Sequence, residues 1–234
     1  MKPSTPENDS YDAHARTCDP NDLWGQVKRT VQGTPLPDEQ IQLILSNTSA
    51  ALALSGSDVL LDLCCGNGAL STHWFAACAD GVGVDASPYL IEVARSHFAP
   101  DRPERFLLSE VLDYLQSPDL RTDFTKAVCY GSLQYLSPER AGAVLAALRA
   151  KLPKLSRIVI GNIPDRDQAT AFFGENMPDA HELDSPRSAI GVWHTQQGFI
   201  ALAQRSGWHC QTRLMPADFY AAHYRFDAIL TPLV

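Results

Sequence analysis

Apolar and polar positions alternate along the chain in blocks that predict helices and strands in turn. Residues 37–54 carry apolar side chains at helical spacing, which predicts an amphipathic helix. A continuous apolar run over 58–63 predicts a buried strand, followed by a helix over 69–79 and a second short strand over 81–85. Ser87-Pro88 then starts another helix, because serine caps the free N–H groups and proline is tolerated in the first turn.

The same rhythm continues to the C-terminus. Helices are predicted after Ser137-Pro138 and after Thr195, and a polar segment over 164–188 interrupts the pattern. Further strands are predicted over 105–108, 126–130, 157–161, 209–214 and 224–230. Strands that alternate with helices favour a doubly wound α/β domain, in which helices cover both faces of a mainly parallel sheet.

Composition and charge narrow the class of protein. Of the 234 residues, 45% are hydrophobic and 20% charged, which is ordinary globular usage. The formal charge of −8 disfavours nucleic-acid backbones and anionic membrane surfaces as partners. The polar residues 1–20 do not resemble a signal peptide, and no apolar stretch approaches the roughly 20 residues that span a bilayer. We expect a cytoplasmic protein whose first twenty residues are loosely ordered or depend on a partner.

The cysteines favour packing over redox or metal chemistry. None of the six forms a C-x-x-C pair, and Cys64 and Cys65 are adjacent, which is awkward for a disulfide. Most lie in apolar segments, so we predict reduced, buried thiols and no metal site.

The turn Cys64-Cys65-Gly66-Asn67-Gly68 is the strongest candidate for chemistry. It follows the first buried strand, where open α/β sheets bind ligands, and its glycines permit a tight backbone close to a ligand. Asp85 ends the next strand, 23 residues after Asp62, which is the position of a carboxylate that accepts hydrogen bonds from a ribose. Together they predict an adenosine-type ligand, either a dinucleotide or another nucleoside. Ser71 stands where the dinucleotide pattern G-x-G-x-x-G requires its last glycine.

With Asp62 upstream, the turn reads D-x-x-x-G-x-G and resembles the first motif of class I S-adenosylmethionine-dependent methyltransferases of the small-molecule type. Cys64 replaces the usual first glycine, and residues 83–87 resemble the second motif. A departure is Thr125, which stands where the family usually has an aspartate. The resemblance implies S-adenosylmethionine (SAM) as cofactor, bound by Asp62, Cys64, Gly66, Gly68, Asp85, Ala86, Glu110, Val111 and Tyr130.

The resemblance runs from about residue 58 to the C-terminus. It implies a Rossmann-like, doubly wound seven-stranded sheet whose last strand, over 224–230, is antiparallel to the others. We predict a helical N-terminal cap over 1–55 and a methyltransferase domain over 56–234, with a lid-like insertion over 164–194.

The methyl acceptor is less well defined. Methyl transfer from a sulfonium mainly requires alignment, and a general base is needed only if the acceptor must lose a proton. Candidates for that base are His181, His194 and His223. Tyr130-Gly131-Ser132-Leu133 replaces the Asp/Asn-Pro-Pro-aromatic motif of enzymes that methylate bases, which argues against DNA.

Aromatic residues favour a small organic acceptor, although the same residues are equally compatible with an ordinary core. They lie in the 164–193 segment and in the N-terminal stretch that holds Tyr11, Trp24 and Arg29. We therefore predict methyl transfer to a small molecule, with an oxygen of a metabolite or glycan precursor as acceptor. Three alternatives remain open: a tRNA-modifying methyltransferase, a catalytically silent SAM-binding protein and a nicotinamide-dependent oxidoreductase. The sequence leaves the oligomeric state undefined.

Overall fold

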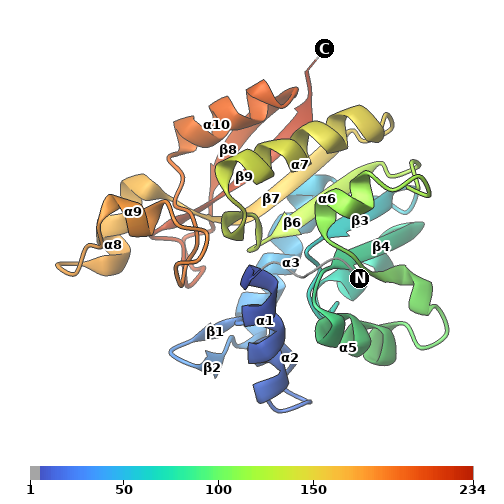
Figure 1. Cartoon of the computed structure of the whole chain (residues 1–234), viewed down its shortest axis with the longest axis horizontal. Helices are drawn as coiled ribbons and strands as arrows, with labels where there is room; N and C mark the ends of the chain where they lie inside the picture. The colour runs from blue at the N-terminus through green and yellow to red at the C-terminus, as the bar shows by residue number, and fades with distance from the viewer. Residues whose placement is uncertain (1–5, 234) are drawn as a thin grey trace. The chain divides into compact units, whose positions relative to one another are not determined.

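The computed structural model describes residues 6–233 (Figure 1). The chain divides after Ser117 into two compact units. The elements of the first unit are α1 (Pro6–Thr17), α2 (Leu23–Gln26), β1 (Thr30–Val31), β2 (Thr34–Pro35), α3 (Asp38–Leu52), β3 (Val59–Leu63), α4 (Ser71–Ala76), β4 (Asp80–Asp85), α5 (Pro88–Phe98), η1 (Pro103–Arg105), β5 (Phe106–Leu108) and α6 (Val111–Leu115). The second unit contains β6 (Lys126–Tyr130), η2 (Leu133–Tyr135), α7 (Pro138–Lys151), β7 (Arg157–Pro164), η3 (Arg166–Gln168), α8 (Ala169–Phe173), α9 (Ala180–Leu183), α10 (Gln196–Arg205), β8 (Trp208–Leu214) and β9 (Arg225–Pro232).

β3 to β9 form a seven-stranded sheet with the order β5-β4-β3-β6-β7-β9-β8, and β1 and β2 pair separately as an antiparallel hairpin. β3, β4 and β5 are mutually parallel, as are β6 and β7, whereas β9 is antiparallel to both of its neighbours. The predicted fold, including its antiparallel last strand, is therefore confirmed. Within residues 6–233, no helix has the length and apolar character needed to cross a bilayer.

Two glycines of β4 make room for aromatic rings in the first unit. A Cβ atom at Gly81 would overlap the ring of Phe75, and one at Gly83 would lie 2.8 Å from both Cys65 Sγ and Phe106 Cδ1. Phe75 and Phe106 are buried, so these rings fill the volume that side chains on β4 would otherwise occupy.

Local start signals position α5 and α7 as predicted. The Ser87 hydroxyl accepts a hydrogen bond from the Leu90 N–H, with Pro88 in the first turn, and Ser137 caps α7 in the same way. The helix predicted over 69–79 is shorter, because α4 spans only Ser71–Ala76. The turn that precedes it occupies the first predicted residues.

The expectation that the first twenty residues are loosely ordered is wrong over the residues that the structure describes, and the alternative, that they depend on a partner, stays a prediction. Residues 6–17 form α1, which packs against α5 and α2, and Ala15 is fully buried. This polar helix is stabilised by its contacts with α2 and α5 in the same unit, and the local sequence does not predict these contacts. Residues 1–5 of the predicted segment lie outside the described part of the chain.

In the second unit, α7 and α10 lie side by side (Figure 1). The segment over 164–194, predicted as a lid-like insertion, contains η3, α8 and α9. Its Phe172 ring lies 4.5 Å from the Tyr224 ring and 5.7 Å from that of Trp193, measured between centroids. The aromatic rings of the segment therefore pack on Tyr224, which directly precedes β9, while Phe172 stays exposed.

Candidate cofactor site

The turn after β3 is built from residues with left-handed backbone. The φ angles are 58° at Cys64, 57° at Gly66 and 76° at Gly68, a region that glycine adopts without strain. A Cβ atom at Gly68 would also lie 2.8 Å from the Phe106 ring. Glycine is thus required at 68 by both conformation and space, whereas Cys64 adopts the same backbone at a cost.

Asp85 ties this turn to the start of α5. Its Oδ2 accepts a hydrogen bond from the Gly66 N–H at 2.9 Å, and its Oδ1 accepts one from the Ser87 N–H at 2.8 Å. Burial raises the pKa of Asp85, and these N–H donors oppose the shift. The contact between Gly66 and Asp85 joins the two motifs that the sequence singled out.

Asp62 is the more deeply buried carboxylate, with 3% of its surface exposed. The Ser71 hydroxyl donates a hydrogen bond to its Oδ2 at 2.5 Å. Burial raises the pKa of Asp62 to about 7, while the Ser71 hydrogen bond and the positive charge of Arg29 lower it. A buried carboxylate with a raised pKa suits a ligand that brings positive charge or hydrogen-bond donors.

Glu110 and its neighbours complete one edge of the sheet. The Ser109 N–H donates to the Asp85 carbonyl at 2.9 Å, and half-buried Glu110 follows, at the start of α6. Val111 is buried, and Ala86 is half-buried beside Asp85. Since β3, β4 and β5 are parallel, the structure brings Asp62, Asp85 and Glu110 to the same carboxyl edge of the first unit.

The N-terminal residues also contact this site, and sequence reasoning missed these contacts. Asn67 Nδ2 donates to the Leu23 carbonyl at 2.7 Å and to Gln26 Oε1 at 3.0 Å. A Cβ atom at Gly66 would lie 2.9 Å from Val27 Cγ1. Of the N-terminal residues considered as a pocket wall, Arg29 acts on the charge of Asp62. Asn67 lies at a variable position of the glycine turn and Gln26 lies outside it, so no motif pointed to this contact.

Tyr130 and the three candidate bases belong to the second unit. Tyr130 is buried at the end of β6, with its ring over Gly161. His181 lies exposed on α9, and exposed His223 contacts Tyr224 with ring centroids 4.7 Å apart. Burial lowers the pKa of His194 to about 4, which makes this imidazole a weak proton acceptor at neutral pH.

A strained asparagine lies in β7, and the sequence offers no signal for it. Asn162 has a φ of 62° at the position where the register between β7 and β9 shifts. The Asn162 N–H donates to Asp227 Oδ1 at 2.8 Å, and its carbonyl accepts from Arg225 Nη1 at 2.7 Å. Buried charged side chains thus hold this bulge in place.

All six cysteines are free thiols. Cys129 and Cys210 are buried as predicted, whereas the prediction of burial is wrong for the other four, which are half-buried. Across residues 6–233, no three His, Cys, Asp or Glu side chains are grouped as a metal ion would require.

The strand order of the seven-stranded sheet is the Rossmann-like architecture found in SAM-dependent methyltransferases of known structure. Residues 60–154, from β3 to just beyond the end of α7, match a family model described as a methyltransferase domain. An uncharacterized methyltransferase of Schizosaccharomyces pombe is 52% identical over 42 residues. These residues make up 18% of this chain and 16% of that protein, so the alignment spans less than a fifth of that relative.

Solved structures match over much more of the chain. Magnesium protoporphyrin IX methyltransferase (ChlM) from Synechocystis PCC 6803 with bound SAM has a TM-score of 0.62 and 15% identity, with 100% of both chains covered. A DhpI-SAM-HEP complex has a TM-score of 0.64 and 16% identity, over 95% of this chain and 94% of that one. A SAM-dependent methyltransferase from Clostridium acetobutylicum ATCC 824 has a TM-score of 0.63 and 12% identity, over 88% of this chain and 95% of that one. At these identities the likeness establishes the fold.

Proposed function

We propose that this chain is a SAM-dependent methyltransferase that moves a methyl group to a small molecule, with an oxygen of a metabolite or glycan precursor as acceptor. The observation that carries the proposal is the hydrogen bond from the Gly66 N–H to Asp85, which joins the glycine turn to the carboxylate of the next strand. The methyltransferase-domain match over residues 60–154 and the likeness to SAM-bound structures support the same activity.

The residues of the first unit fit this cofactor chemically. Asp85 is half-buried and bears carboxylate oxygens that accept hydrogen bonds, as ribose hydroxyls require. Asp62 offers a carboxylate to the positive charge of the amino-acid end, and Glu110 with Val111 would border the adenine. The small residues Cys64, Gly66, Gly68 and Ala86 would let the backbone approach the ligand. Tyr130 stays a proposed cofactor contact on the resemblance alone.

The bound cofactor supplies an electrophilic methyl group on a sulfonium sulfur. Held by Asp62, Asp85 and Glu110, the cofactor would pass this methyl group to an acceptor oxygen, and its sulfur would keep the electron pair of the broken bond and become neutral. The protein's task is to align the two partners, since a well-oriented encounter removes much of the barrier. A hydroxyl acceptor also loses its proton, and the lowered pKa of His194 makes this residue a weak base at neutral pH, so His181 and His223 stay the other candidates.

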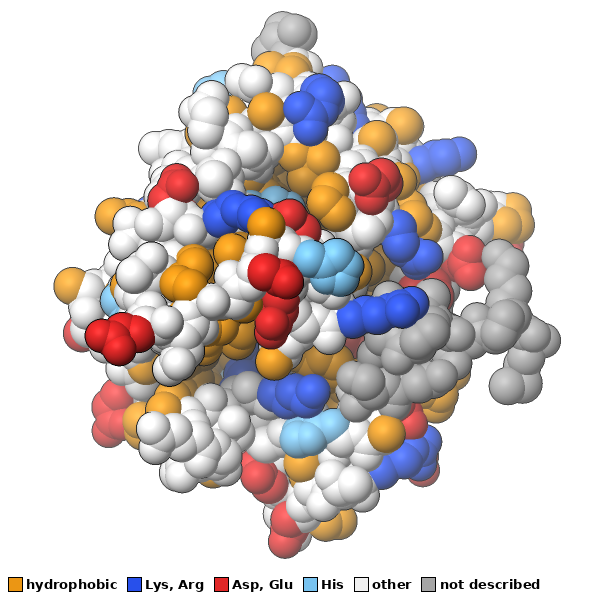
Figure 2. All heavy atoms as spheres, turned by 60° about the vertical axis from the view of Figure 1, so that its left-hand side comes forward, with side chains coloured by type: hydrophobic (Ala, Val, Ile, Leu, Met, Phe, Trp, Pro, Cys, Tyr) orange, Lys and Arg blue, Asp and Glu red, His pale blue; other side chains and the backbone are white. Residues whose placement is uncertain are grey.

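The acidic surface favours a small-molecule acceptor over a nucleic acid. On the face drawn in Figure 2, Lys and Arg side chains lie scattered among acidic and apolar ones. A dispersed arrangement of this kind does not provide the continuous basic track that follows a phosphate backbone.

Calorimetry tests the cofactor assignment. Wild-type protein is titrated with SAM and with its demethylated product, S-adenosylhomocysteine (SAH), beside Asp85→Ala and the matched control Asp101→Ala, which changes an exposed aspartate of the same unit. We expect Asp85→Ala to weaken binding about tenfold or more, because charge-assisted hydrogen bonds are lost, and Asp101→Ala to bind normally. Equal affinity of wild type and Asp85→Ala would refute the proposal that Asp85 binds the ribose.

The acceptor is tested with SAM that carries a labelled methyl group. The protein is incubated with pools of small metabolites, sugar precursors and bulk tRNA, and the labelled product is located by mass spectrometry. Label on an oxygen of a small molecule supports the proposal. Transfer to tRNA alone refutes the small-molecule acceptor, and a labelled nitrogen or carbon refutes the oxygen.

A further inference from the structure

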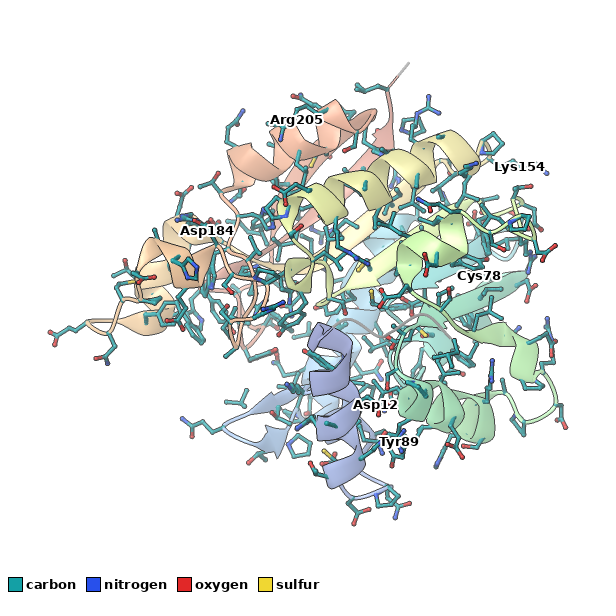
Figure 3. All side chains as sticks on the ribbon, in the orientation of Figure 1. Asp12, Cys78, Tyr89, Lys154, Asp184 and Arg205 are labelled. Carbon is teal, nitrogen blue, oxygen red and sulfur yellow. The ribbon has the colours of Figure 1, made fainter. Side chains whose placement is uncertain are left out.

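Residues 6–36, called here the N-terminal segment, contact both turns of the candidate cofactor site. The first contact joins α1 to the start of α5. Asp12 Oδ1 accepts hydrogen bonds from the Ser87 hydroxyl at 2.7 Å and from the Tyr89 N–H at 2.9 Å. Figure 3 shows Asp12 of α1 facing the start of α5, where Tyr89 lies. Ser87 is the residue whose N–H holds Asp85.

The second contact joins the N-terminal segment to the glycine turn. Asn67 Nδ2 donates to the Leu23 carbonyl and to Gln26 Oε1, and Gln26 Nε2 donates in turn to the Pro20 carbonyl at 3.1 Å. Asn67 and Gln26 are both at least 99% buried. A buried network with these partners is strongly directional, so it fixes where the segment crosses the turn.

Charge reinforces the contact made by Asp12. The carboxylate lies at the N-terminus of α5, where the helix dipole favours negative charge. Arg16 Nε donates to Asp12 Oδ2 at 2.6 Å, and its guanidinium lies 5.0 Å from the centre of the Tyr89 ring. Burial acts to raise the pKa of Asp12, but the hydrogen bonds from Ser87, Tyr89 and Arg16 outweigh it, so the pKa is lowered. Asp12 is therefore ionised at neutral pH.

We infer that the N-terminal segment is a strap of the cofactor site, with Asp12 as the latch that must open when the cofactor exchanges. Asp12 is then a positioning residue, which acts through Ser87 on the turn that holds Asp85. A ligand that spans the two turns stabilises the segment tied to both of them, and by linkage the docked segment stabilises the ligand to the same extent. The inference rests on the proposed function only in taking SAM and SAH as ligands of this site.

The test measures the dissociation rate of SAH from wild type, from Asp12→Ala and from the control Glu92→Ala, which removes an exposed carboxylate from the same helix α5. We expect SAH to leave Asp12→Ala about tenfold faster or more, which corresponds to about 1.4 kcal/mol, because the latch is absent. Dissociation from Glu92→Ala should stay within about twofold of wild type, as for surface changes away from any contact.

Hydrogen exchange provides a readout that a purely structural role would not change. In wild type, saturating SAH should slow amide exchange across α1, and this protection should be lost in Asp12→Ala while exchange in α3 is unaffected. If Asp12→Ala does not fold, Asp12→Asn retains one carbonyl acceptor and should give an intermediate dissociation rate. The strap is refuted if SAH dissociates from the Asp12 variants at the wild-type rate. It is also refuted if SAH leaves the amide exchange rates of α1 unchanged in wild type. SAH that fails to bind wild type refutes the proposed function, and the strap with it.

Discussion

Cys64 occupies a left-handed backbone position, and replacing it tests whether the turn is strained as its geometry indicates. The informative comparison is between Cys64→Gly and Cys64→Ala. Both variants remove the thiol and its contacts, so their difference isolates the backbone. We expect Cys64→Gly to be the more stable of the two, which reverses the usual order of glycine and alanine.

The magnitude follows from two opposing terms. An L-residue in the left-handed region costs roughly 1–2 kcal/mol, which glycine avoids. Glycine instead loses roughly 0.4–1 kcal/mol relative to alanine, because its unfolded chain has more freedom. The difference should therefore favour Cys64→Gly by about 1 kcal/mol in the free energy of unfolding.

Thermal unfolding measures this difference directly. For a chain of this size, 1 kcal/mol corresponds to a shift in Tm of roughly 2–4 °C. A control pair at Ala94, where the backbone is helical, should show the ordinary order, with glycine less stable than alanine. A Cys64→Ala protein as stable as Cys64→Gly would refute the argument that the turn stores backbone strain.

The remaining predictions concern two buried groups that titrate with opposite effects. Burial raises the pKa of folded Asp62 to about 7, above its unfolded value of 3.8, so the free energy of unfolding should fall as the pH rises from 4 to 7. Denaturant titrations at pH 5 and 7.5 should show this loss of stability in wild type but not in Asp62→Asn. The same change in the free energy of unfolding between the two pH values in both proteins would contradict the prediction. Burial lowers the pKa of folded His194 from 6.5 to about 4, so its contribution to stability should rise with pH over that window. His194→Gln should lose this rise. If the free energy of unfolding of His194→Gln still rises over this pH range as in wild type, His194 is not a buried neutral imidazole.

The tie between the two cofactor turns was accessible to prediction because it follows from topology. Parallel strands bring their carboxyl ends to one edge, so Asp62 and Asp85 had to lie near each other once 58–63 and 81–85 were read as neighbouring strands. The hydrogen bond from the Gly66 N–H to Asp85 shows that the turn after the first of these strands and the end of the second are in contact. Ser87 as the cap of α5 was equally visible, because capping depends only on local sequence.

The contacts of α1 could not be predicted in the same way. Asp12 meets Ser87 across 75 residues of sequence, and neither residue belongs to a pattern that reports on the other. The bulge at Asn162 is also hidden, because it depends on Asp227 and Arg225 in a strand far along the chain. Periodicity reports which face of an element is buried, whereas these features depend on which polar groups happen to meet.

The fit of aromatic rings against glycines in β4 has a consequence for how this chain can evolve. Because the ring of Phe75 takes the space of a side chain at 81, and Phe106 does the same at 83, the members of each pair are not free to change independently. In diverged homologues, a larger residue at 81 should occur together with a smaller one at 75, and a larger residue at 83 with a smaller one at 106. Co-variation of these two pairs would record their packing in natural sequences, without any variant being made.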